Sequence, residues 1–272
     1  MRVLLVVAYD GTAYHGWQVQ SSEPMTIEGQ LNRVLTELTG EEIQVIGASR
    51  TDAGVHALGN IAVFDTNATI PSASYKKAMN GRLPWDIRIV DSYQVEDDFH
   101  PRHRDTKKTY VYRIYHGDVC MPMDRHQCFH VYGPVDVDKM KKATEFFIGE
   151  HDFAAFCAAG SQAETTVRTI YELEVTTKPT KEFSFPSLVC ADGEKLDSFI
   201  NKTVEDEYIE IRVQGSGFLY NMVRIIAGTL LAVGRGTIAV EDIPNIIASL
   251  DRGKSGPTLP AMGLILDHYE FC

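Results

Sequence analysis

The chain has 272 residues, 44% of them hydrophobic, which is enough for a sizeable core in one large domain or two modest ones. It carries 26 Lys and Arg residues against 37 Asp and Glu residues, a formal net charge of −11. This balance argues against a phosphate-binding surface over the whole molecule, because such surfaces are built from Lys and Arg. A polarised chain can still bind RNA on one basic face.

The cysteines and the N-terminus indicate the compartment. Five irregularly spaced cysteines include no CxxC pair, so the sequence holds no recognisable zinc motif, and free thiols in a reducing cytoplasm are expected. The apolar run at residues 3–7 is too short for a signal peptide, and no apolar run approaches membrane-spanning length. We therefore expect a cytoplasmic protein without a membrane partner.

Short apolar runs with strand character recur along the chain. They cover residues 3–9, 43–48, 61–64, 88–95, 109–115, 171–176, 208–213 and 263–270. A helical period lies between the early runs, with Thr26 placed as an N-cap. The apolar face of this helix is formed by Ile27, Leu31, Val34, Leu35 and Leu38.

Three further helices are expected in the second half of the chain. Residues 137–147 have an amphipathic period closed by Gly149, and residues 243–250 have another with acidic residues in the first turn. Residues 218–233 are apolar nearly all round, which predicts a buried central helix.

Strands dominate, and helices are interspersed without strict alternation, which predicts an α+β fold with a mostly antiparallel sheet. A charged run near residues 100–108 separates two strand-rich halves. We expect an N-terminal part over residues 1–104 and a C-terminal part over residues 105–272. Residues 178–207 are polar and turn-rich, which predicts a long loop that could carry a short hairpin.

The segment 49–57, Ser-Arg-Thr-Asp-Ala-Gly-Val-His-Ala, lies between two of the apolar runs. An Asp near a Gly is common in structural turns. A carboxylate mounted between core strands is also placed rigidly enough to act as a nucleophile or general base. Arg50, two residues before Asp52, would favour the ionised carboxylate if the side chains meet.

Basic and aromatic residues are interleaved over residues 99–113. Tyr110 and Tyr112 alternate on a predicted strand and share one face. Cations that meet phosphates and a ring that stacks on a base suit RNA, although a half-buried strand with a solvated charge run has the same pattern. The spacing of His100 and His103 could suggest metal ligands, but no third ligand is evident.

A cation occurs on the predicted buried helix. Arg224 needs a carboxylate partner there, since unpaired buried charge is costly, unless its side chain reaches water. Asp52 is the obvious partner. Of the two arginines, Arg224 is the better candidate for that pair, which leaves Arg50 free.

These segments together resemble the tRNA pseudouridine synthase A family. Residues 50–57 match its R-T-D-A-G-V-H-A loop, and residues 9–18 are similar to its Y-D-G-T-x-[FY]-x-G-W-Q element. Lys108, Tyr110 and Tyr112 match a K-x-Y-x-Y strand, and residues 99–102 resemble F-H-A-R with Pro in place of Ala. Residues 215–224 are similar to its Gly–Phe–Arg element. Departures are Ser49, where the family usually has Gly, and the polar segment 178–207.

The resemblance implies the pseudouridine synthase fold, with two related α/β subdomains around a cleft and helices flanking a mixed sheet. It implies isomerisation of uridines 38 to 40 in the tRNA anticodon arm, with the base flipped out, by a cofactor-free and metal-free homodimer. Asp52 would be the nucleophile, Arg224 its partner, Arg50 the group that fills the vacated space and Tyr110 the stacking ring. The expected RNA contacts are His56, Lys108, Arg102 and Arg104.

Two other functions share parts of this pattern. A non-catalytic RNA-binding or RNA-folding protein could keep the scaffold, although the intact set of Asp52, Tyr110 and Arg224 argues against it. A carboxylate-based nucleosidase usually needs a pair of acids around the bond, and no second acid accompanies Asp52 in its loop.

Overall fold

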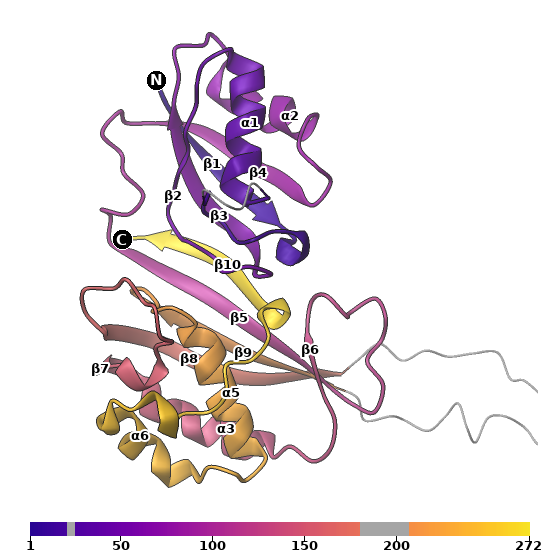
Figure 1. Cartoon of the computed structure of the whole chain (residues 1–272), viewed down its shortest axis with the longest axis vertical. Coiled ribbons are helices and arrows are strands. Elements are labelled where there is room, and N and C mark those ends of the chain that lie inside the picture. Colours follow the sequence, from indigo (N-terminus) through magenta and orange to yellow (C-terminus); the bar gives the residue numbers. More distant parts are fainter. Residues whose placement is uncertain (21–24, 180–206) are drawn as a thin grey trace, which may run out of the picture.

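The computed structural model describes residues 1–20, 25–179 and 207–272 (Figure 1). Ten strands among these residues form one sheet, in the order β4-β1-β3-β10-β5-β9-β8-β7, with β2 on β3 and β6 on β5. Neighbouring strands run antiparallel except for β10 beside β3 and β6 beside β5. The predicted α+β class with a mixed, mostly antiparallel sheet is confirmed.

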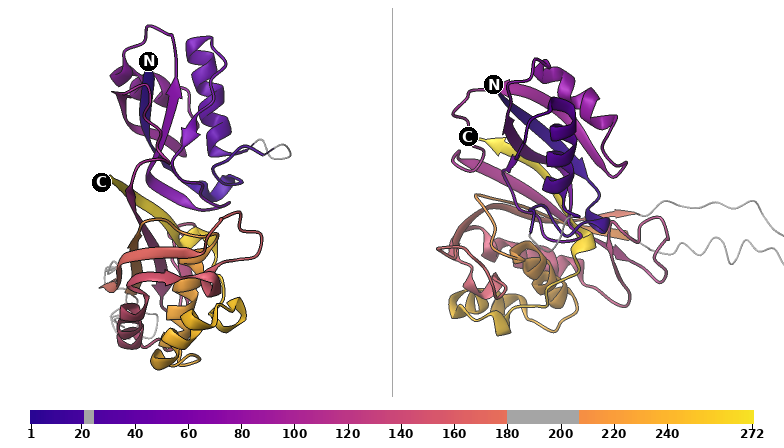
Figure 2. Two further views of the ribbon diagram at one scale, coloured as in Figure 1. Left: turned by 90° about the vertical axis from the view of Figure 1, so that its left-hand side faces the viewer. Right: turned by 45° about the horizontal axis from the view of Figure 1, so that its top comes forward.

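The N-terminal half packs its helices on the strands β1 (Arg2–Tyr9), β3 (His56–Asp65) and β4 (Ile87–Val95). Helix α1 (Ile27–Thr39) begins at the predicted N-cap, where the Thr26 hydroxyl accepts from the Gly29 N–H at 3.2 Å. It ends at Gly40, whose φ of 73° is the left-handed conformation that favours glycine. Figure 2 shows α1 covering one side of these strands.

The C-terminal half is built on the longer strands β5 (Thr106–His116), β8 (Val167–Pro179) and β9 (Glu207–Gly215). Short strands β6 (Phe129–Val131) and β7 (Gly149–Asp152) complete it. Helices α3 (Val137–Thr144), α5 (Met222–Gly234) and α6 (Ile243–Ser249) gather below these strands in Figure 1. Helix α5 is buried over most of its length, as predicted from its apolar sequence.

The last strand joins the two halves. Strand β10 (Leu264–Phe271) lies between β3 and β5, and it pairs with β3 only through Ile265 and Leu266. The partners of these two residues, His56 and Ala57, directly follow the loop that carries Asp52. The sheet is therefore continuous across residue 104, and the division into 1–104 and 105–272 stays a prediction.

Several predicted boundaries are wrong. Strand β2 is only Ile46–Gly47, because the backbone N–H groups of Ile43 and Val45 bond to side chains of α1 instead of to a strand. Helix α5 begins at Met222 instead of residue 218, because Asn221 has a left-handed φ of 59°. Helix α3 ends at Thr144, and a 3₁₀ turn follows before Gly149.

Three elements had no prediction: α2 (Tyr75–Asn80), β6 and β7. The loop predicted at 178–207 falls mainly on residues 180–206, which lie outside the described residues. At its borders, Lys178 and Pro179 extend β8, and Glu207 begins β9. None of the helices in the described ranges is both long enough and apolar enough to span a membrane.

Candidate active site

The loop between β2 and β3 carries Asp52 in a tight turn. The Val55 N–H donates to the Asp52 carbonyl at 3.1 Å, and Gly54 adopts a φ of 77°. The Tyr9 and Thr51 hydroxyls lie 2.7 Å apart, which ties the loop to the end of β1. These contacts hold the backbone of Asp52 on the rigid edge of the N-terminal strands.

Residues 10–18, which follow β1, pack against the loop that carries Asp52. The Trp17 N–H donates to the Thr51 carbonyl at 3.0 Å, and the Gly54 N–H donates to the Tyr14 carbonyl at 3.3 Å. A Cβ at Gly11 would lie 2.0 Å from the Val55 carbonyl oxygen, so only glycine permits this approach. The sequence element at residues 9–18 thus positions the Asp52 loop, and its tryptophan is fully buried.

Arg224 reaches Asp52 from the first turn of α5. Its Nη1 lies 3.9 Å from the Asp52 Oδ2, so the predicted pairing of these two residues is present, at the long end for an ion pair. The guanidinium is held by two shorter bonds, to the Asn221 Oδ1 and to the Leu259 carbonyl, both at 2.6 Å. The left-handed Asn221 therefore orients the arginine toward the carboxylate.

The carboxyl group of Asp52 is partly desolvated. Burial raises its pKa above the ordinary aspartate range, and the charge of Arg224 opposes this rise without cancelling it. Desolvation is thus the larger of the two effects on this pKa, and Arg224 is the cation that acts against it.

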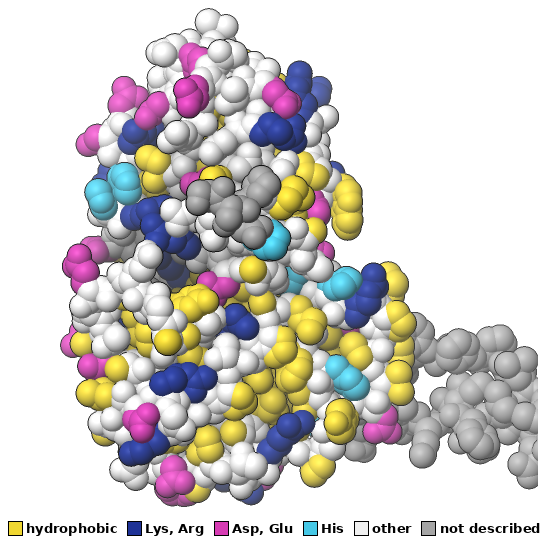
Figure 3. Space-filling view, in the orientation of Figure 1, with side chains coloured by type: hydrophobic (Ala, Val, Ile, Leu, Met, Phe, Trp, Pro, Cys, Tyr) yellow, Lys and Arg dark blue, Asp and Glu magenta, His cyan; other side chains and the backbone are white. Residues whose placement is uncertain are grey.

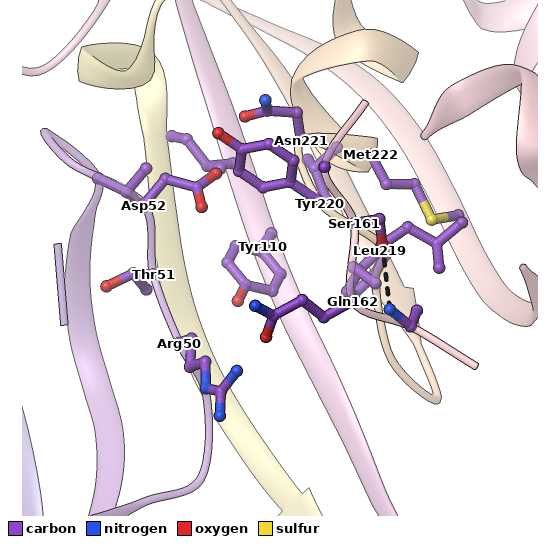
Figure 4. Close-up of a pocket in the computed structure, with 16 residues that line it drawn as sticks. Arg50, Thr51, Asp52, Tyr110, Ser161, Gln162, Leu219, Tyr220, Asn221 and Met222 are labelled. Carbon is purple, nitrogen blue, oxygen red and sulfur yellow. Dashed lines mark hydrogen bonds between the residues drawn. The ribbon is translucent and has the colours of Figure 1, made fainter. Parts of the chain in front are cut away.

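A cavity of about 420 Å³ opens beside Asp52, between the two halves. Tyr110, from β5, lines it and is buried, with its ring edge-on to Phe218 at 5.2 Å between centroids. Arg50 is exposed and also lines it. Figure 4 shows Tyr110 between the Asp52 loop and the chain on the opposite wall. The fold thus brings together the four predicted residues Arg50, Asp52, Tyr110 and Arg224.

Part of the cavity wall comes from residues that had no prediction. They are Gly160, Ser161, Gln162 and Ala163, from the loop before β8, and Leu219, Tyr220, Asn221, Met222 and Val223, around the start of α5. The resemblance covered residues 215–224 but assigned a role only to Arg224. The loop at 160–163 gave no signal, because it is short, polar and without periodicity.

A second cavity, of about 560 Å³, lies near the C-terminus and is lined by the predicted RNA contacts Arg102, Arg104 and Lys108. Burial lowers the pKa of Lys108, and the charges of Arg102 and Arg168 lower it further. Arg104 forms an ion pair with Glu96 at 3.6 Å. Figure 3 shows a group of Lys and Arg side chains on the surface between the two halves of the molecule.

His56 lies apart from both cavities. Its side chain is buried, its Nδ1 accepts from the Gly11 N–H at 3.1 Å, and its Nε2 lies 3.2 Å from the Met262 carbonyl. These contacts join the start of β3 to the segment before β10. In this structure His56 thus serves to connect these two segments, and its predicted RNA contact stays a prediction. Within the described ranges, no group of three or more His, Cys, Asp or Glu residues could hold a metal ion.

Comparison with known proteins identifies the family. The family model described as tRNA pseudouridine synthase matches residues 5–104 and 143–271. The chain belongs to this family. The tRNA pseudouridine synthase A of Thermoanaerobacter sp. (strain X514) is 43% identical over 264 residues, 97% of each chain. The protein of that name from Acetivibrio thermocellus is 42% identical, and tRNA pseudouridine synthase A 2 of Clostridium perfringens is 40% identical, with the same 97% coverage of each chain.

Proposed function

We propose that this enzyme converts uridines 38 to 40 of the tRNA anticodon arm to pseudouridine, with Asp52 as the nucleophile. Family membership makes the chain an isomerase that acts on tRNA. The observation that supports the finer assignment is the cavity lined by both the ring of Tyr110 and Asp52, which is paired with Arg224.

The reaction needs only a held carboxylate and a confined base. The C1′–N1 bond breaks, the base turns, and a C1′–C5 bond forms; the proton leaves C5, and N1 gains one. Asp52 supplies the nucleophile for this exchange, and Arg224 favours its ionised form against the opposing effect of burial. Tyr110 offers a ring on which the base can stack. No oxidant, reductant or transferred external group enters, so no cofactor is required.

The target base must leave its stem before it reaches Asp52. Unstacking and unpairing cost a few kcal/mol. Arg50 is exposed at the cavity and forms no hydrogen bond or ion pair with residues in the described ranges, so its side chain is available to occupy the vacated space.

The second cavity extends the site toward the RNA backbone. Arg102 and Lys108 form no ion pair with a carboxylate in the described part of the chain, although Asp105 also lines this cavity. Neighbouring cations without an ion-pair partner favour phosphate binding. Arg104 adds a third cation. A homodimer in the cytoplasm, with tRNA across both subunits, would bring two such basic regions together on an acidic chain.

The alternatives are less favoured. A non-catalytic RNA-binding protein does not require an arginine-paired carboxylate in a cavity, and the relatives are named as synthases. A nucleosidase would need a second acid near the bond, and Asp52 is the one acidic residue from the described ranges that lines the main cavity.

Tritium release from tRNA labelled at C5 of uridine tests the reaction, and mapping of the product tests the position. We expect the wild-type protein to release tritium and to leave pseudouridine at positions 38 to 40. Release with product outside the anticodon arm would overturn the assigned position. No release at all would overturn the reaction.

A further inference from the structure

The main cavity contains one carboxamide that is free to bind a ligand. The Thr51 hydroxyl is bonded to Tyr9, and the Asn221 side-chain oxygen accepts from Arg224. The Ser161 hydroxyl accepts from the Ala163 N–H at 3.4 Å. The Gln162 carboxamide is exposed and has no hydrogen bond to any residue within the described ranges.

The loop around Gln162 is fixed at its ends. The Ala158 N–H donates to the Tyr220 carbonyl at 3.1 Å, and the Phe153 N–H donates to the Thr166 carbonyl at 3.0 Å. Gly160 turns the chain with a φ of 87°. In Figure 4 the Gln162 carboxamide extends from this loop toward Tyr110, on the wall opposite Asp52. A base stacked on Tyr110 with its sugar toward Asp52 would therefore direct its far edge at Gln162.

The far edge of uracil is the imide, in which the N3–H donor lies between the O2 and O4 acceptors. A carboxamide presents a donor and an acceptor side by side, which matches N3–H and one neighbouring oxygen. Arg50 has donors only, and the Tyr220 hydroxyl is a single group. Among the polar side chains that line the cavity, Gln162 is therefore the one suited to this paired contact.

The symmetry of the base makes such a contact useful in this reaction. A half-turn about the axis through N3 and C6 exchanges N1 with C5, the change that pseudouridine formation requires. The same turn exchanges O2 with O4 and leaves N3–H in place. A group bound to N3–H and one oxygen therefore finds the same hydrogen-bonding pattern before and after the turn.

We propose that Gln162 is a positioning residue that holds the imide edge of the flipped uracil through its rotation. This inference rests on the proposed function and adds to it the group that faces the base opposite the nucleophile. The base stays aligned with Asp52 while it turns, because Gln162 binds the N3–H group, which lies on the rotation axis.

The test combines a side-chain change with a change in the base. Gln162→Met keeps the length of the side chain and removes both hydrogen-bonding groups. Synthetic anticodon stem-loops carry either uridine or 3-methyluridine at the target position, and nucleoside analysis of the products gives kcat/KM for each. N3-methylation also weakens pairing in the free RNA, but this effect is the same for both enzymes and cancels in the comparison.

We expect Gln162→Met to lower kcat/KM for uridine about 10-fold, as for the loss of a short hydrogen-bonded contact. N3-methylation should slow the wild-type enzyme by about 10-fold or more and should slow the Gln162→Met enzyme by much less. Glu164→Ala, a change at an exposed residue of the same loop outside the cavity lining, should match the wild type on both substrates.

An equal effect of methylation on both enzymes would overturn the proposal, because the methyl group and Gln162 would then act independently. A wild-type enzyme that converts 3-methyluridine as fast as uridine would overturn it without reference to any variant. A second variant, Gln162→Glu, keeps an acceptor for N3–H and loses the donor, so it should retain the methylation effect at lower activity. Wild-type inactivity on uridine would overturn this proposal together with the proposed function.

Discussion

Two opposing effects act on the pKa of the Asp52 carboxyl group. Burial raises its pKa, and Arg224 at 3.9 Å lowers it. A nucleophile that is partly desolvated is more reactive than a hydrated one, but it must still be ionised at the working pH. The arginine is held by Asn221 and Leu259, so its charge stays near the carboxylate without a tight ion pair that would block attack.

The pH dependence of activity should report this balance. If ionised Asp52 is required, kcat/KM falls as the pH drops through its raised pKa. Arg224→Met removes the group that lowers this pKa, so the acidic limb should move to higher pH. Arg235→Met, at the opposite end of α5, should leave the limb unchanged. An unshifted limb in Arg224→Met would show that the arginine does not act on the carboxylate.

At the scale of secondary-structure elements, residues 10–18 after β1 hold the Asp52 loop in position. Gly16 has a φ of 89°, and a Cβ there would lie 2.7 Å from the Thr51 carbonyl oxygen. Gly40 has a similar φ of 73°, but a Cβ there would meet nothing within 4 Å. An alanine at Gly40 would therefore cost only the left-handed backbone conformation, whereas an alanine at Gly16 would also clash with the Thr51 carbonyl.

Gly40→Ala should lower the free energy of unfolding by about 1 kcal/mol, from the left-handed conformation alone. Gly16→Ala should lower it by roughly 2–4 kcal/mol, because overpacking against the loop adds to that cost. Denaturant unfolding measures both, and Gly16→Ala should also lose activity as its folded form shifts Asp52. Equal destabilisation by the two changes would contradict the role of Gly16 as a close contact to the loop.

The elements near the site were predictable to different degrees. Thr26 caps α1 where the sequence placed it, because an N-cap is a local interaction that the sequence records directly. The start of α5 was not predictable, since Asn221 takes a left-handed conformation that brings its side chain to Arg224. Gln162 joins the cavity only through the tertiary placement of its loop, which no local pattern encodes.

At the scale of the molecule, a chain of net charge −11 brings Arg102, Arg104 and Lys108 together in the second cavity. Lys108 lies there beside the other cations of the second cavity, and burial makes its charge costly until an anion arrives. The continuous sheet places this cavity and the one at Asp52 on β5, since Lys108 and Tyr110 both belong to that strand. Under the proposed function, one strand would carry both the phosphate contact and the base contact.

Affinity for tRNA should therefore depend on salt. Lys108→Gln should weaken binding and reduce the slope of log affinity against log salt by about one, as expected for one lost phosphate contact. Lys139→Gln, at an exposed residue of α3 paired with Asp136, should change neither. A slope that Lys108→Gln leaves unaltered would place the phosphate contacts elsewhere.

The central claim is that Asp52 is the nucleophile. Its removal should not unfold the protein: a carboxyl whose folded pKa is raised contributes stability below its unfolded pKa, and that contribution is lost as the pH rises through the folded pKa. Asp52→Asn should therefore be at least as stable as the wild type at pH 7. The same change in an exposed carboxylate on β3, Asp65→Asn, costs only a surface ion pair with Arg2 and serves as the control.

The most direct measurement is tritium release from C5-labelled tRNA by folded Asp52→Asn. We predict that turnover falls by about 10⁴-fold or more while tRNA binding is retained, and that Asp65→Asn keeps wild-type turnover. Turnover by Asp52→Asn within a few-fold of the wild type would contradict the account.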